Sequence, residues 1–328
     1  MRVFVTGATG FIGQALTREL IAHGHEVIGL ARSGAAATTL RAMGVGVVRG
    51  SVRDVDGLRR AAAHADGVVH LAFTFSPLDM APRRLARVFL GGSPFRLVQR
   101  MMAAIGATDR AAIDALGSAL QGSGRPLVTT FATMGLAGLP GEMALKAATE
   151  EDPPNPRSAG YARAVNEEAV AHWTERDVRA SLVRLPPSVH GEGDKGLIPQ
   201  LINAARKAGE ALYVDEGAQR WFGVHRDDAC ALFRLALEQG APGGIYHAVG
   251  DDGARFKDIA EAIGGGLNLP VRRNSLAEAR RALGLVAPFV ATDNPVSSAL
   301  TQQRIGWKPQ GPTLMQELDH ADYFNKGL

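Results

Sequence analysis

The sequence contains very little cysteine and almost no imbalance of charge. Cys230 is the single cysteine among 328 residues, so no disulfide can form within the chain, and the sequence favours a reducing compartment such as the cytoplasm. The net charge is only +3. A nucleic-acid partner would require a basic stripe, which this mild excess does not provide. The remaining composition, 46% hydrophobic and 21% charged, is that of an ordinary globular protein.

Long apolar runs, a leader-like N-terminus and metal-ligand spacings are absent as well. No window holds ~18 uncharged apolar residues, so the sequence predicts no membrane span. The chain opens on a strand-like pattern and not on a basic region followed by an apolar stretch, so we expect no targeting segment. His190 and His225 lack a second metal ligand at a suitable spacing. The sequence therefore predicts a small-molecule substrate without metal, membrane or nucleic acid, and leaves open whether the chain forms a homodimer.

The first half of the chain alternates short β-branched runs with helical stretches. Strands are expected at 3–6, 27–30, 45–49, 67–71, 126–130 and 181–185, with a helix at 12–23. This alternation predicts an α/β fold with a Rossmann-type, doubly wound parallel sheet. Prolines and glycines cluster after 185. We therefore expect a nucleotide-binding domain at 1–185 and a smaller, mostly substrate-binding portion at 186–328, packed over the carboxyl edge of the sheet.

A glycine-rich loop joins the first expected strand to the first expected helix, with the spacing G-x-x-G-x-x-G. Such a loop turns tightly and lets backbone N–H groups approach a pyrophosphate, and the N-terminus of the following helix adds donors and partial positive charge. We predict that it binds a dinucleotide. The residues expected at this site are Gly7, Thr9, Gly10, Phe11, Ile12 and Gly13.

The end of the second expected strand indicates which dinucleotide is bound. NAD-binding proteins usually place an acidic residue there to hold the adenosine ribose. This chain has Arg32 and Ser33 instead. A guanidinium suits a 2′-phosphate, which accepts paired, charge-assisted hydrogen bonds. The sequence therefore favours NADP(H) over NAD(H).

Several motifs together resemble those of the extended and atypical short-chain dehydrogenase/reductases, a family that includes nucleotide-sugar epimerases and dehydratases. They are TGATGFIG at 6–13, RDV at 53–55, HLA at 70–72, RLPPSVHG at 184–191, VHRDD at 224–228 and IGWKP at 305–309. The resemblance covers nearly the whole chain. It implies that Asp54 and Val55 lie beside the adenine, that Leu71 and Ala72 lie along the middle of the cofactor, and that Pro186 adds to the cofactor site.

The catalytic helix of the family carries a tyrosine and, four residues later, a lysine on the same face. The lysine favours the phenolate of the tyrosine, whose ordinary pKa is ~10, and holds the nicotinamide ribose. Tyr161 is the tyrosine candidate, but Val165 stands at the lysine position. Arg163 would lie ~200° around a regular helix from Tyr161 and does not share its face. A tyrosine without the lysine can donate a proton but is a poor base, so the pattern favours carbonyl reduction.

Two further side chains complete the predicted catalytic set. The spacing of the family places Thr130 at the hydroxyl position, with Thr133 as the alternative. Asp109 shares a helical stripe with Ile113 and Leu116, and a carboxylate on a core-facing stripe calls for a reason. The resemblance implies that it replaces an asparagine that organises active-site water. The alternative is that a helix begins here and that Thr108 or Asp109 is its N-cap.

The segment 76–106 has no counterpart in the family motifs. Five arginines and one acidic residue give it a charge of +4, and apolar residues lie between them. It could form a lid or subunit contact, a packed helix pair, or a membrane-surface helix, and we favour the first two.

The sequence as a whole predicts an NADP-dependent oxidoreductase of the atypical short-chain class that reduces a small carbonyl compound. A nucleotide-sugar epimerase or dehydratase is the first alternative, and Val165 argues against it because those reactions begin with an oxidation. A non-catalytic NADP-binding regulator or redox sensor is the second.

Overall fold

The computed structural model describes residues 1–73, 86, 88, 97–320 and 322–325. The chain forms two compact units, and each is assembled from separate stretches of sequence. Unit 1 consists of Met1–Phe131, Ala162–Val183 and Cys230–Tyr246. Unit 2 consists of Ala132–Tyr161, Arg184–Ala229 and His247–Leu328. The domain boundary predicted at 185 lies beside one of the points where the chain passes from unit 1 to unit 2.

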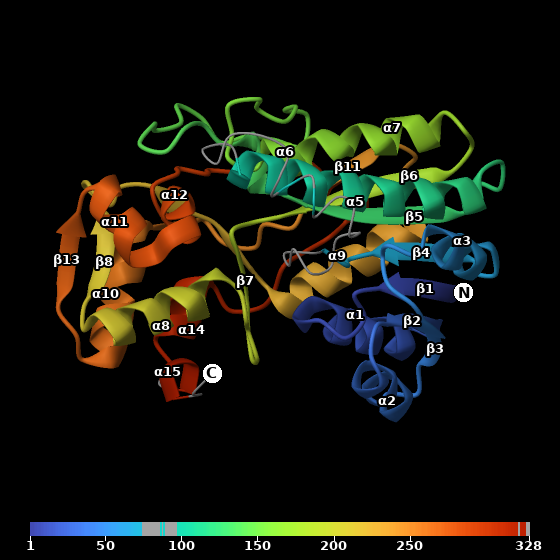
Figure 1. The fold of residues 1–328 in the computed structure, drawn as a ribbon, viewed down its shortest axis with the longest axis horizontal. Coiled ribbons are helices and arrows are strands. Elements are labelled where there is room, and N and C mark those ends of the chain that lie inside the picture. The colour runs from blue at the N-terminus through green and yellow to red at the C-terminus, as the bar shows by residue number, and fades with distance from the viewer. Residues whose placement is uncertain (74–85, 87, 89–96, 321, 326–328) are drawn as a thin grey trace. The chain divides into compact units, whose positions relative to one another are not determined.

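A seven-stranded sheet, in the order β11-β6-β5-β4-β1-β2-β3, forms the centre of unit 1 (Figure 1). Its strands are β1 (Arg2–Thr6), β2 (Glu26–Ala31), β3 (Gly46–Arg49), β4 (Gly67–His70), β5 (Pro126–Ala132), β6 (Arg179–Leu185) and β11 (Gly244–His247). β1 pairs in parallel with both β2 and β4, so the strand order reverses at β1. Such a switch point is where open α/β sheets bind ligands. The predicted Rossmann-type sheet is confirmed, with β11 as a strand that the sequence did not predict.

Helices cover both faces of this sheet. They are α1 (Phe11–Ala22), α2 (Gly34–Ala42), α3 (Val55–Ala63), α5 (Leu97–Leu120), α6 (Tyr161–Ala164), α7 (Glu168–Thr174) and α9 (Arg226–Gln239). Alternate residues of a strand point to opposite faces, so Phe4 and Val68 lie on one face while Gly29 and Gly67 open onto the other. A Cβ on Gly29 would meet Leu40 of α2 at 2.6 Å. The helix α2 therefore packs closely on that second face.

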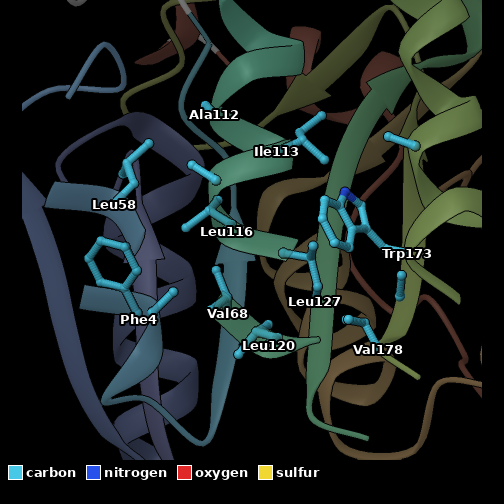
Figure 2. Close-up of a cluster of buried hydrophobic side chains, with 14 of the residues drawn as sticks. Phe4, Leu58, Val68, Ala112, Ile113, Leu116, Leu120, Leu127, Trp173 and Val178 are labelled. Carbon is cyan, nitrogen blue, oxygen red and sulfur yellow. The ribbon is translucent and has the colours of Figure 1, made fainter. Parts of the chain in front are cut away.

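The first face is covered by α3, α5 and α7, and Figure 2 shows the apolar cluster that joins them to the strands. Trp173 of α7 is its largest member. Its ring leaves no room for a side chain on Gly117 of α5, because a Cβ there would lie 2.4 Å from the indole. The indole Nε1 donates to Asp114 at 3.2 Å. A glycine in the middle of a long helix thus admits the large ring that locks α5 to α7.

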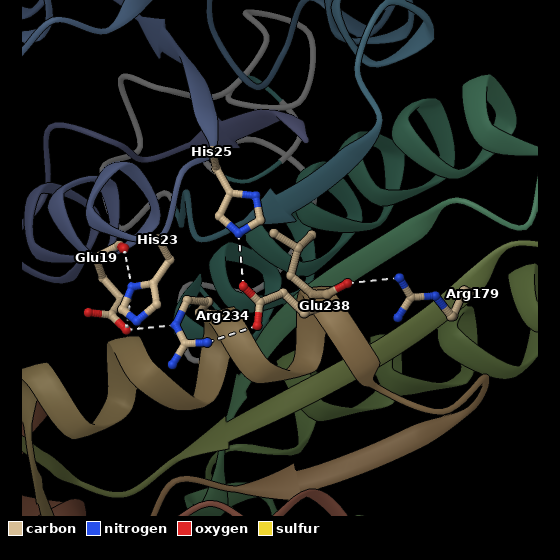
Figure 3. A network of polar contacts seen from close by, with 7 residues as sticks. Glu19, His23, His25, Arg179, Arg234 and Glu238 are labelled. Atoms are coloured by element: carbon tan, nitrogen blue, oxygen red, sulfur yellow. Dashed lines mark hydrogen bonds and ion pairs between the residues drawn. The ribbon is translucent and has the colours of Figure 1, made fainter.

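On the opposite face, α1 and α9 are joined by a polar network (Figure 3). Arg234 of α9 donates to Glu19 of α1 at 2.7 Å and to Glu238 at 2.8 Å. The other oxygen of Glu238 lies 2.9 Å from Nε2 of His25, just before β2. Arg179 of β6 donates to the backbone of Leu237 at 2.8 Å. These contacts fix the last helix of unit 1 to three earlier segments of the chain.

Unit 2 has a core of its own, built from shorter elements. They are β7 (Ser188–His190), α8 (Leu197–Ala208), β8 (Ala211–Val214), β9 (Arg220–Trp221), β10 (Gly223–His225), β12 (Ala254–Arg255), α10 (Phe256–Leu267), β13 (Val271–Asn274), α11 (Leu276–Leu283), α12 (Ala287–Val290), α13 (Ala299–Ile305), α14 (Leu314–Leu318) and α15 (Asp322–Asn325). β7 pairs with β10 and β8 with β13, both in parallel. Trp221 is fully buried and meets the ring of Phe256 edge-on at 5.0 Å.

The predicted insertion at 76–106 lies largely outside the described residues. The three hypotheses for it therefore stay predictions. Its last part, from Leu97 on, forms the first turns of α5. None of the helices within the described ranges has the length and apolarity needed to cross a bilayer.

Candidate cofactor and active site

The glycine loop in unit 1 is packed too tightly for side chains at two of its glycines. Gly7 has φ +74°, and a Cβ on it would lie 2.8 Å from the backbone nitrogen of Ala72. A Cβ on Gly13 would lie 2.0 Å from the carbonyl oxygen of Gly7. The turn closes with a 2.9 Å hydrogen bond from Gly10 N to Gly7 O. The loop therefore has the tight form that a dinucleotide-binding turn needs.

The helix α1 begins directly after this turn, with Gly10 as its N-cap. Glycine has no side chain to accept hydrogen bonds from the first helical turn, and none caps this helix. The first turn also contains no acidic residue. An uncapped helix N-terminus beside a close-packed glycine turn attracts an anion. The predicted residues Thr9, Phe11 and Ile12 lie in this turn and at the start of the helix, so the loop fits the pyrophosphate of a dinucleotide.

The end of β2 carries the residues predicted to choose between the two dinucleotides. Arg32 and Ser33 are both exposed there. The hydroxyl of Ser33 caps α2 by accepting from Ala36 N at 3.1 Å. The neighbouring strand places Arg49 opposite Ala31, and the Arg49 guanidinium lies 4.0 Å from the position of a Cβ on Gly34. The start of α2 thus lies beside two arginines, and the first turn of α2 contains no acidic residue.

The other predicted cofactor residues lie at the ends of neighbouring strands or just beyond. Asp54 caps α3 through a 2.9 Å hydrogen bond from Gly57 N, and Val55 is the first residue of that helix. Leu71 and Ala72 follow β4 and donate to the backbone and the hydroxyl of Thr6 at 3.3 and 3.2 Å. They are therefore held against the glycine loop.

Pro186 is buried in unit 2, between β6 and β7. Its place in the cofactor site remains a prediction.

Asp109 lies in the middle of α5, which begins at Leu97, so the alternative that this residue belongs to a helix N-cap is wrong. Its side chain is buried and has three polar neighbours from other segments of unit 1. Oδ1 lies 3.4 Å from His70 Nε2, and Oδ2 lies 3.9 Å from Arg163 Nε. Asn166 Nδ2 donates to Oδ2 at 3.3 Å. Sequence reasoning missed these partners, although His70 stands inside the HLA motif.

The remaining catalytic candidates differ in whether their hydroxyl group already donates a hydrogen bond. Thr130, near the end of β5, donates to the carbonyl of Val183 at 3.1 Å. In unit 2, Thr133 is fully buried and donates to Asn294 Oδ1 at 2.6 Å. Tyr161 begins α6 and is half-buried, and its phenol makes no hydrogen bond to any residue that the structure describes. Of these three candidates, Tyr161 alone has a hydroxyl proton that none of the described residues accepts.

Unit 2 holds an arginine that is already paired. Arg220 donates from Nε and Nη2 to the two oxygens of Asp293, at 3.1 and 2.7 Å. Burial acts to raise the pKa of Asp293, but these hydrogen bonds outweigh it and hold the pKa below its ordinary value. Arg220 is thus paired with a carboxylate whose charged form is favoured.

Unit 2 also contains a cavity of about 550 Å³, lined by the loop after β7 and by α8 and α14. Its walls carry charges of both signs, among them Arg206, Arg226 and Glu317.

Comparison with known proteins agrees with this geometry. The family model described as NAD dependent epimerase/dehydratase family matches residues 3–249. An uncharacterized protein of Schizosaccharomyces pombe is 41% identical over 326 residues, which cover 99% of this chain and 100% of that protein. A 2-alkyl-3-oxoalkanoate reductase of Stenotrophomonas maltophilia is 31% identical over 246 residues, covering 74% of this chain and 67% of that protein.

A solved structure of similar fold is dTDP-glucose 4,6-dehydratase from Streptomyces venezuelae with NAD bound. It has a TM-score of 0.74 at 20% identity, and the match covers 99% of this chain and 97% of that one. The resemblance to extended and atypical short-chain dehydrogenase/reductases is thereby confirmed. The chain belongs to the NAD-dependent epimerase/dehydratase family of oxidoreductases.

Proposed function

We propose that this protein is an NADP-dependent reductase of a small carbonyl compound, of the atypical short-chain class. The observation that carries the cofactor choice is the end of β2, where Arg32 stands at the place of the ribose-binding acid. Arg49 of the adjacent strand adds a second positive charge there, and it makes no ion pair or hydrogen bond to another described residue. Two guanidinium groups favour a 2′-phosphate and offer nothing to a ribose hydroxyl that needs an acceptor.

The other residues have separate roles in this proposal. The glycine loop and the start of α1 would hold the pyrophosphate, with Asp54 and Val55 by the adenine and Leu71, Ala72 and Pro186 along the rest of the cofactor. When bound, the cofactor supplies a hydride. Tyr161 would donate the proton that the reduced oxygen needs, because its phenol is not engaged within the described residues. Thr130 would accept a hydrogen bond through its hydroxyl oxygen while it donates its own proton to the carbonyl of Val183.

The epimerase or dehydratase alternative is less well supported by the side chains. Its first step is an oxidation, which requires a base that Tyr161 without a neighbouring lysine does not provide. Its substrates also carry phosphates. Arg220 already donates two hydrogen bonds to Asp293, so its positive charge is less available to bind a phosphate. Reduction of a small carbonyl compound requires neither a base nor a phosphate-binding cation. By its name, the relative called 2-alkyl-3-oxoalkanoate reductase reduces the keto group of a carboxylate.

Titration of NADPH and NADH, followed by their fluorescence, tests the cofactor choice. Arg32→Ala should weaken NADPH binding ~10- to 100-fold, the loss expected for a charge-assisted hydrogen bond of about 1.5–3 kcal/mol. NADH binding should change less than about twofold, because the affected group is the 2′-phosphate. Arg41→Ala is the matched control, since Arg41 is an exposed arginine at the far end of α2. Equal losses for both cofactors, or no preference in the wild type, would contradict the assignment.

Turnover is tested with NADPH and a panel of ketones and aldehydes. The wild type should oxidise NADPH with at least one of them, and Tyr161→Phe should lose most of that rate with its NADPH affinity intact. Tight NADPH binding without consumption of any carbonyl compound would overturn the reductase and favour the non-catalytic regulator.

A further inference from the structure

A buried carboxylate in unit 1 is kept charged by its neighbours. Asp109 is 6% exposed and sits on the core side of α5. Burial acts to raise its pKa, but His70, Arg163 and Asn166 outweigh this and hold the pKa of Asp109 below its ordinary value. A cavity of about 10 Å³ beside it, lined in part by His70 and Thr108, has room for one water at most. The carboxylate is therefore buried, and its neighbours favour its charged form.

The orientation of His70 follows from its second partner. Nδ1 of His70 lies 2.7 Å from Thr6 Oγ1, and that hydroxyl also accepts from Ala72 N at 3.2 Å. The hydroxyl can donate to a bare Nδ1 or accept from a protonated one. A bare Nε2 would turn its lone pair toward the carboxylate of Asp109, which is unfavourable. In each favourable state Nε2 carries a proton facing Asp109, so the imidazole fixes the carboxylate from one side.

Arg163 approaches the same carboxylate from the other side and is held in place by three kinds of contact. Its guanidinium carbon lies 3.9 Å from the centre of the Phe73 ring and 5.5 Å from that of Phe131. Nη2 donates to the carbonyl of Thr130 at 2.7 Å. Nε faces Asp109 at 3.9 Å. The planar cation is thus locked by aromatic contact, by a backbone hydrogen bond and by charge.

This fixed cation lies at the carboxyl edge of the sheet. Thr130 is near the end of β5, and Phe73 follows the end of β4 by three residues. That edge is where open α/β sheets bind their ligands. Arg163 lies in α6 with Tyr161, but α6 ends at Ala164 and a turn of 3₁₀-helix follows, so the α-helix stops before Val165. Val165, at the expected lysine position, is 37% exposed. The position four residues after Tyr161 is therefore not the only one from which this segment can place a cation at the site.

We propose that Arg163 supplies a positive charge at the active site in a role different from that of the family's lysine, with Asp109 as its positioning residue. This inference rests on the proposed reductase activity. In the reduction, hydride adds to the carbonyl carbon and the π electron pair moves onto the oxygen. Tyr161 gives that oxygen its proton, and the resulting phenolate regains a proton from water. Arg163 gives up no proton; its role is to stabilise the charge that develops on the oxygen.

Substitutions at Arg163 and Asp109 separate this role from a structural one. Arg163→Gln should lower kcat about 10²- to 10³-fold, the usual effect of removing one electrostatic donor. The KM for the carbonyl compound and the Kd for NADPH, measured by fluorescence, should change less than about threefold, since the charge acts on the developing oxyanion. Asp109→Asn should lower kcat about tenfold, because the Arg163 guanidinium remains but loses the carboxylate that positions it.

A second set of variants guards against misfolding. Arg163→Lys should keep part of the rate at neutral pH and lose it at alkaline pH, where a desolvated ammonium loses its proton while the wild-type guanidinium does not. The double variant Arg163→Gln/Asp109→Asn removes both buried charges together and should fold with the kcat of the single variant. Arg110→Gln is the matched control, since Arg110 lies next to Asp109 on α5 but pairs with Asp114 and Glu168.

Two outcomes overturn the proposal. One is a normal kcat in Arg163→Gln. The other is parallel loss of kcat, NADPH binding and unfolding temperature in the Gln and Lys variants, which is a structural effect. If the wild type reduces no carbonyl compound, the proposed function fails, and the cation is tested by ¹⁹F NMR titration of the NADP⁺-loaded protein with trifluoroacetate. Binding lost in Arg163→Gln and kept in Arg110→Gln supports a cation presented to ligands, whereas equal binding contradicts it.

Discussion

His247, in unit 2, is a buried histidine that the surrounding groups keep neutral. Nδ1 lies 2.7 Å from the carbonyl of Ser297, so it carries the proton and donates it. Nε2 accepts from Nη1 of Arg184 at 3.1 Å. A proton on Nε2 would break that hydrogen bond and place a second cation against the arginine. Burial and the charge of Arg184 lower the pKa of His247 to about 3.

The depressed pKa makes stability depend on pH in a defined window. In the unfolded chain a histidine titrates near ~6.5, so the contribution is full above that pH and is lost as the pH falls from there toward about 3. Within the window, each pH unit lowers the free energy of unfolding by ~1.4 kcal/mol. Between pH 7.5 and pH 5 the loss from this one group is therefore ~2 kcal/mol.

Urea unfolding of the wild type and of His247→Gln at pH 7.5, 6 and 5 measures this contribution. A glutamine amide can accept a hydrogen bond from Arg184 and does not titrate. The free energy of unfolding of the variant therefore lacks the pH dependence that His247 contributes. The wild type should be the more stable protein at pH 7.5, and its advantage should shrink by ~2 kcal/mol at pH 5. An advantage that stays the same at all three pH values would refute the argument that His247 is held neutral.

Two further predictions concern unit 1. Burial acts to raise the pKa of Glu238, but its hydrogen bonds with His25 and Arg234 outweigh it and lower the pKa, so its contribution is present above ~4.5 and lost below it. Glu238→Gln should lower the free energy of unfolding by ~0.5–1 kcal/mol at pH 7 and by less at pH 4, as thermal melts would detect. Gly13→Ala should weaken NADPH binding at least ~10-fold and lower the free energy of unfolding by ~1–3 kcal/mol, because its Cβ would meet backbone. Gly10→Ala is the control, with a Cβ 3.2 Å from Gly7 O and an ordinary φ of −76°, and equal effects of the two would contradict the packing argument.

The sheet was predictable because its pattern is local. Each of the six expected strands is a short apolar run that ends near a glycine or a polar loop, and the alternation with helices implies parallel pairing. β11 has only four residues and begins on Gly244, so it carries no period that separates it from a loop. The return of 162–183 and 230–246 to unit 1 depends on contacts between distant segments, which no local pattern records.

The candidate site was predictable to the same degree. The glycine loop is a contiguous motif with one physical requirement, and Gly7 and Gly13 meet it. Asp109 could be singled out because a charge on an apolar stripe is anomalous. Its partners could not, since His70 and Arg163 come from segments far apart in the sequence. Helical counting placed Arg163 away from Tyr161, and α6 contains both residues, but counting along the chain cannot show that the guanidinium faces Asp109.

The uncapped start of α1 links the lifetime of this protein to its ligand. A helix whose N-cap is Gly10 has no side chain to complete its first turn, so in the proposed function a phosphate group would complete it. Ligand bound only to the folded chain stabilises it by ~1.4 kcal/mol for each tenfold rise in concentration above its Kd. A cell that depletes the dinucleotide would therefore raise the fraction of open, protease-sensitive chains, and the amount of this protein would follow the cofactor supply.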